Sequence, residues 1–150
     1  MGCDYNIEEE FRIMKTHVDH GLEIVQRSAW LTDAATVVSA HHEKFDGSGY
    51  PHGARGKTIP VAARIFAIVD VFDALTSHRP YKAPLSFEES MVILEQDRGS
   101  HFDPQLLDRF HAIAKTLYER YAGREDEGLH EELAAVTAEY FSAAPESLRY

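Results

Sequence analysis

Three histidines and one aspartate are the residues of this chain best suited to metal chemistry. His41 and His42 are adjacent, His17 borders the apolar stripe of an upstream segment, and Asp70 lies between two valines. Neutral imidazole is a common metal ligand, and carboxylates complete sites for divalent iron, manganese or zinc. Because adjacent residues on an ideal helix diverge by about 100°, we expect His41 and His42 to serve two metals, or one metal and one substrate.

Each of these residues also has a plainer interpretation. His17 could be a partly exposed structural histidine, and the pair His41–His42 could cap the end of a helix. Asp70 could form an ion pair with Arg64, since an unpaired buried carboxylate is costly. Glu43 could orient an imidazole from behind, although a solvated charge at a helix end is the simpler expectation. The residue types alone therefore leave a metal site and a set of structural roles open.

The first half of the chain shows mainly helical periodicity, and the helices that it predicts would position the three histidines and the aspartate. Apolar residues recur at intervals of three and four over 7–26 and again over 31–42, as on amphipathic helices. Residues 45–58, FDGSGYPHGARGKT, are rich in glycine and polar residues and are predicted to form a loop. Residues 60–77 are apolar almost all round, which predicts a central buried helix.

Three further helices are predicted in the second half of the chain. A capping box opens one of them at Ser86. The pair Asp103 and Pro104 is typical of the start of the next helix, and Gly123 is typical of its end. A last helix is expected over 129–140. Because no strand pattern is visible, the predicted fold class is all-α, a bundle of about six helices.

Composition limits the class of protein further. The 150 residues are 44% hydrophobic and 27% charged, which is typical of one globular domain. The net charge of −10, with no basic stripe, argues against a duplex nucleic acid as partner. No apolar run has the roughly 20 residues that a membrane span needs. A single cysteine, Cys3, excludes an internal disulfide and favours a reducing compartment, so a cytoplasmic location is predicted.

The segment HHEKFDGSGYPHGARGKTIPVAARIFAIVDVFDALTSHRPYK resembles the HD-GYP family of bacterial HD-superfamily phosphohydrolases. The resemblance continues upstream through EEEFRIMKTHVDHG and downstream through GSHFDPQLLDRF, so that it covers roughly residues 7–112. It implies an all-helical, HD-domain-like fold that binds two or three metal ions, usually iron or manganese. It also implies hydrolysis of the bacterial second messenger cyclic di-GMP to the linear dinucleotide or GMP.

The resemblance assigns roles to individual positions of this chain. It implies that the metal ligands are His17, His41, His42 and Asp70. The signature loop beside the substrate would be formed by Gly49, Tyr50 and Pro51, which could also contact a protein partner. The basic pair that holds the substrate phosphates would be Arg79 and Lys82. A bidentate guanidinium and a mobile ammonium are suited to that task.

One part of the family pattern has no match in these 150 residues. The family is named for a His-Asp dyad that supplies further metal ligands, and no His-Asp dipeptide occurs here. We therefore expect residues 1–123 to form a truncated HD-GYP-like domain with an incompletely occupied metal site. Residues 124–150 are expected to form a C-terminal helical extension packed on the same domain. No residue is assigned a catalytic role on this basis.

Three functions remain open at this stage. The first is a module that binds metal, nucleotide or protein in cyclic di-GMP signalling, with weak or no phosphodiesterase activity of its own. The second is an active phosphodiesterase, as a fragment of a longer enzyme or with its site completed by another chain. The third is a helical adaptor without metal. Apolar surface left uncovered by missing helices would recruit a partner, so a homodimer or swapped assembly is also predicted.

Overall fold

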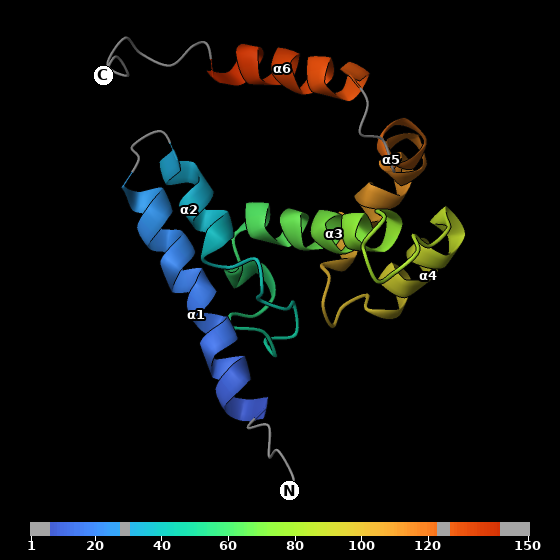
Figure 1. Ribbon diagram of the computed structural model, residues 1–150. Helices are drawn as coiled ribbons and strands as arrows, with labels where there is room; N and C mark the ends of the chain where they lie inside the picture. The colour runs from blue at the N-terminus through green and yellow to red at the C-terminus, as the bar shows by residue number, and fades with distance from the viewer. Residues whose placement is uncertain (1–6, 28–30, 123–126, 142–150) are drawn as a thin grey trace, which may run out of the picture.

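The computed structural model describes residues 7–27, 31–122 and 127–141, and the fold that it shows is helical (Figure 1). Cys3 and Gly123 lie outside these ranges. The helices are α1 (Ile7–Gln26), α2 (Thr32–Val38), α3 (Val61–Thr76), α4 (Phe87–Gln96), α5 (Pro104–Tyr121) and α6 (Glu127–Phe141), with a short 3-10 helix, η2 (Gly56–Thr58). Among the described residues there is no strand, which confirms the prediction of an all-α fold of six helices. None of the described helices is long and apolar enough to cross a membrane.

The helices follow one another in space much as they do along the chain. α1 and α2 lie side by side, α2 packs against α3, and α3 continues to α4 and α5, which also contact each other (Figure 1). The loop between α2 and α3 folds back beside α1. A contact between α5 and α6 is the ion pair of Arg120 with Glu132. The prediction that the C-terminal extension packs on the domain remains a prediction.

The main hydrophobic core lies among α3, α4 and α5. Its buried members are Ile68, Phe72, Met91, Leu94, Phe102, Leu107, Phe110 and Ala114. A second, smaller cluster of Ala40, Ile59 and Ala63 lies where the loop joins α3. The larger core therefore supports α3 from one side, and the smaller one fastens the loop to the beginning of that helix.

Local capping signals correctly predicted where α4 and α5 begin. Ser86 accepts a hydrogen bond from the backbone N–H of Glu89, and the Glu89 carboxylate accepts one from the backbone N–H of Ser86 in return. Asp103 accepts hydrogen bonds from the backbone N–H groups of Gln105 and Leu106 at 2.8 and 3.4 Å, and Pro104 is the first helical residue. These contacts satisfy amides that have no partner inside the helix.

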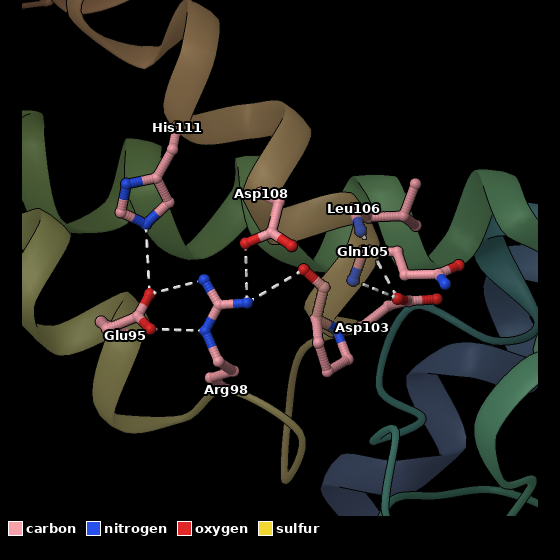
Figure 2. Close-up of polar contacts among 8 residues, drawn as sticks. Glu95, Arg98, Asp103, Gln105, Leu106, Asp108 and His111 are labelled. Atoms are coloured by element: carbon pink, nitrogen blue, oxygen red, sulfur yellow. Dashed lines mark hydrogen bonds and ion pairs between the residues drawn. The ribbon is translucent and has the colours of Figure 1, made fainter.

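A polar network joins the end of α4 to the start of α5 (Figure 2). The Arg98 guanidinium contacts the Glu95 carboxylate, lies 2.9 Å from Asp108 and donates a hydrogen bond to the Pro104 carbonyl at 3.1 Å. His111 Nε2 lies 3.2 Å from Glu95. Because Glu95 and Asp108 are largely exposed, water weakens these pairs. Their main effect is to orient the loop between the two helices.

Two expectations about helices were wrong. The helix expected over 31–42 ends at Val38, so that His41 and His42 lie in the turn that follows it. The helix expected to be buried all round, α3, instead exposes Val61, Ile65 and Val69 by 53%, 46% and 44%. Its opposite side faces the main core, and no described element covers these three side chains fully.

Candidate metal centre

Three imidazoles from two segments of the chain converge on one point. His17 comes from α1, whereas His41 and His42 come from the turn after α2. One nitrogen of each ring lies within 4.8 Å of the corresponding nitrogens of the other two. The Nε2 atoms of His17 and His42 are 2.9 Å apart. Metal–nitrogen bonds are about 2.1 Å long, so two ring nitrogens bound to the same ion lie about as far apart as the Nε2 atoms of His17 and His42. The three rings therefore fit a metal.

The end of α2 explains why the adjacent histidines do not diverge. Because the helix stops at Val38, His41 and His42 are free of helical geometry, and their ring centroids are 3.9 Å apart. The expectation that they serve two metals, or one metal and one substrate, assumed an ideal helix; that premise was wrong, and what each histidine binds remains a prediction. His41 Nδ1 lies 2.9 Å from the Val38 carbonyl. A carbonyl can only accept, so Nδ1 carries the proton and Nε2 of the neutral ring keeps its lone pair.

His42 is held from two sides. Its ring is stacked on that of Tyr50, with centroids 4.7 Å apart and planes 25° from parallel, and it meets His17 edge-on. Burial, followed by the electrostatic effects of His41 and His17, lowers the pKa of His42 from 6.5 to about 4, while the charge of Asp70 opposes the shift. The imidazole is therefore neutral at pH 7, which is the protonation state that a metal ligand needs.

Asp70 lies near this cluster without belonging to the three-histidine group. The Phe66 ring meets the His41 ring edge-on at 6.1 Å, and residues four apart share one face of a helix. Asp70 is thus one turn further along the same face of α3, and its charge acts on His42. The expected burial of Asp70 was wrong, because its side chain is exposed. Of the open alternatives, the ion pair with Arg64 is not favoured, because Arg64 pairs with Asp103 at 2.5 Å. Asp70 remains a predicted ligand.

The signature loop is packed against the backbone that carries the histidines. A Cβ atom on Gly49 would lie 2.3 Å from the Lys44 nitrogen and 2.5 Å from the His42 carbonyl oxygen, so only glycine fits. The Tyr50 N–H donates to that same carbonyl at 3.2 Å. Pro51 is exposed and follows a cis peptide bond. Among the three predicted loop residues, Tyr50 is thus the one whose side chain is seen to stack on the ring of a candidate ligand.

The predicted phosphate-binding pair lies in a separate turn beyond the end of α3. Arg79 and Lys82 exchange backbone hydrogen bonds of 3.2 and 3.1 Å, which close a four-residue turn, and both side chains are exposed. The structure does not bring them into the histidine cluster. Tyr81, between them, is also fully exposed. Any ligand that touches both the turn and the histidines must extend along α3.

Of two further residues beside the histidines, sequence reasoning favoured the wrong role for one and missed the other. Glu43, expected to be solvated, is 2% exposed and accepts backbone hydrogen bonds from the loop. Lys15 places its ammonium 5.4 Å from the centre of the Tyr50 ring. The position of Glu43 directly after the histidine pair was a signal for the first. Nothing in the sequence pattern singled out Lys15.

Comparison with known proteins agrees with the fold and with the motif. The family model of the HD domain matches residues 4–106, and the chain belongs to that family. Within it, the named relatives place the chain in the HD-GYP branch. A probable cyclic di-GMP phosphodiesterase of Vibrio cholerae is 44% identical over 110 residues, or 68% of this chain and 25% of the relative. A cyclic di-GMP phosphodiesterase of Thermotoga maritima is 39% identical over 121 residues, or 79% of this chain and 33% of the relative.

Another relative is named for a different cyclic dinucleotide. The 3′3′-cGAMP-specific phosphodiesterase 2 of Vibrio cholerae is 44% identical over 118 residues, or 73% of this chain and 23% of the relative. The crystal structure of a cyclic GMP-AMP-specific phosphodiesterase of the same organism superposes with a TM-score of 0.57 at 24% identity, over 77% of this chain and 25% of that one. The last comparison shows the fold alone. The chain spans between about a quarter and a third of the curated relatives described here.

Proposed function

We propose that this chain forms the metal-binding and substrate-binding part of a cyclic dinucleotide phosphodiesterase site, with cyclic di-GMP as the ligand. The observation that carries the proposal is the convergence of His17, His41 and His42 beside the signature loop. The relatives named for cyclic di-GMP support the choice of ligand. Iron and manganese are the metals that the family resemblance favours.

Each group of the chain has a distinct role in this proposal. The three imidazoles and Asp70 would hold the metal, which when bound polarises phosphoryl oxygens and makes water a better nucleophile. The bond from His41 to the Val38 carbonyl fixes which nitrogen faces the centre. Arg79 and Lys82 would bind phosphate oxygens of the dinucleotide, and Gly49, Tyr50 and Pro51 would border it.

We further propose that the 150-residue chain by itself hydrolyses the dinucleotide weakly or not at all, and acts as a binding or interaction module. The reason is chemical: a bridging hydroxide needs two metals held close together. Three imidazoles and one exposed carboxylate are few ligands for two ions. The alternative is an active phosphodiesterase whose site is completed by further sequence or by another chain. The clustered imidazoles give no support to an adaptor without metal.

Metal analysis combined with a hydrolysis assay on the same protein tests the proposal. After loading with manganese or ferrous iron and gel filtration, we expect bound metal near stoichiometry and little turnover of cyclic di-GMP. His17→Ala should abolish most of the metal binding. His20→Ala is the matched control, because His20 lies on the same helix with an exposed side chain outside the cluster. Absence of metal from the wild-type protein would refute the metal site, whereas rapid hydrolysis would favour the active enzyme.

A further inference from the structure

Glu43 is a buried carboxylate whose described partners are backbone amides. Its side chain follows His42 directly in the sequence and is 2% exposed. One carboxylate oxygen accepts from the backbone N–H of His52 at 2.7 Å, and the other accepts from the backbone N–H of Ala54 at 2.9 Å. Hydrogen bonds to an ionised carboxylate are stronger than neutral ones, which offsets the cost of burying the charge. Both oxygens are thus used to hold the loop.

The same loop is attached to His42 by two further contacts. The Tyr50 N–H donates to the His42 carbonyl, and Gly49 packs against the backbone of residues 42–44. Residues 49–54 are therefore attached at several points to the backbone of His42 and to the side chain of Glu43. The Tyr50 ring, held between these attachments, covers one face of the His42 imidazole.

We propose that Glu43 is a positioning residue for the metal centre: its carboxylate holds residues 52–54 so that Tyr50 covers His42 and keeps that imidazole directed at His17. The role deepens the proposed function and rests on it, because it concerns how well the three imidazoles are arranged for a metal. A carboxylate is needed because two N–H donors face it. Glutamine would offer one acceptor and turn an NH2 group toward the other donor, leaving a buried N–H unsatisfied.

The test compares Glu43→Gln and Glu43→Asp with the wild-type protein. Manganese affinity is measured by calorimetry, and the contact between the Tyr50 and His42 rings is followed by NMR in the metal-free protein. Loss of a residue that orients a ligand weakens metal binding by about 10- to 100-fold, and we expect a loss of that size for Glu43→Gln. Glu43→Asp keeps two acceptor oxygens and should bind manganese more tightly than Glu43→Gln.

A matched control separates positioning from general stability. Glu89 is also a carboxylate that accepts a backbone N–H, that of Ser86, but it belongs to the cap of α4. Glu89→Gln should lower the unfolding midpoint and leave manganese affinity unchanged. The inference is overturned if Glu43→Gln binds manganese like the wild type, or if the Tyr50–His42 contact persists in that variant. If the wild type binds no metal, the proposed function fails, while loss of the ring contact in Glu43→Gln would still support the positioning role.

Discussion

At the level of single residues, the contacts of each imidazole decide what it can do. The bond to Val38 leaves His41 with one nitrogen for a ligand, and the Tyr50 ring covers one face of His42. Neither contact can be read from the order of residues, because both arise where the chain leaves the helix. The residue types alone left a metal site and structural roles open, whereas the convergence of the three rings depends on the packing of α1 against α2.

The lowered pKa of His42 predicts how the metal-free protein responds to acid. The folded-state pKa of about 4 lies below the ordinary value of 6.5, so between these values the unfolded chain binds a proton that the folded chain does not. Stability should therefore fall as the pH is lowered from about 6.5 to 4. Urea unfolding at several pH values should show a shallower fall for His42→Ala. An identical pH dependence in both proteins would contradict this prediction.

Gly49 predicts a steric effect at the loop. A methyl group there would overlap the backbone of residues 42–44, so Gly49→Ala should cost about 1–3 kcal/mol of unfolding free energy and weaken manganese binding. Gly56→Ala is the control, because a Cβ at Gly56 meets nothing within 4 Å but has a φ of +57°. Alanine at this φ costs about 1 kcal/mol of unfolding free energy, and Gly56→Ala should leave the metal affinity unchanged. Equal effects of the two variants on metal affinity would argue against a steric role for Gly49.

At the level of elements, features that depend on neighbouring residues were predicted correctly, whereas features that depend on contacts between distant residues were not. The extent of α1 and the starts of α4 and α5 were predictable, because periodicity and caps are properties of neighbouring residues. The end of α2 at Val38 was not predictable: no glycine or proline marks it, and the turn after it is held by Glu43 and the loop. The exposure of α3 was also not predictable from the sequence. An apolar pattern indicates which residues prefer burial, but it does not indicate which of them are covered by another element.

The start of α5 predicts a large difference between two helix caps. Asp103 caps its helix and also pairs with Arg64, and both side chains are largely buried. Asp103→Ala should therefore cost roughly 3 kcal/mol or more, because it leaves the guanidinium without that partner. Ser86→Ala removes an exposed cap and should cost about 1 kcal/mol. Urea unfolding measures both, and equal losses would show that the ion pair adds nothing.

Asp103 also makes the stability of the fold depend on pH. Burial alone would raise the pKa of Asp103, but hydrogen bonds from Arg64 and from the amides of Gln105 and Leu106 outweigh it and lower the pKa. A carboxyl with a lowered folded-state pKa stabilises the fold above its ordinary value of 3.8. That contribution is lost as the pH falls through the folded-state pKa. It therefore acts at lower pH than the loss associated with His42.

At the level of the whole molecule, an apolar groove runs between α3 and α5. Its lining includes Val61, Ile65, Val69 and Ile113, each of which is 44–53% exposed. Exposed apolar patches of this kind mark interaction sites, and symmetric pairing of one face is the commonest way for identical chains to associate. We therefore expect a homodimer through this groove, in line with the prediction from sequence.

Sedimentation at increasing concentration checks this expectation. Ile65→Glu and Ile113→Glu place a charge in the groove and should shift the protein towards monomer. Val92→Glu is the control, since Val92 is 57% exposed on α4 and does not line the groove. A wild-type protein that stays monomeric at all concentrations, or a control that dissociates as readily as the two groove variants, would reject the groove as the dimer interface.

Residues 49–54 are attached through their backbone atoms, and this has a consequence for how the sequence of the protein can vary. Glu43 recognises the N–H groups of His52 and Ala54, which every residue except proline possesses. The exposed side chains at Ser48 and His52 can therefore change in size and charge without moving the ring that covers His42. The rim of the candidate site can therefore vary in sequence while the three imidazoles keep their positions.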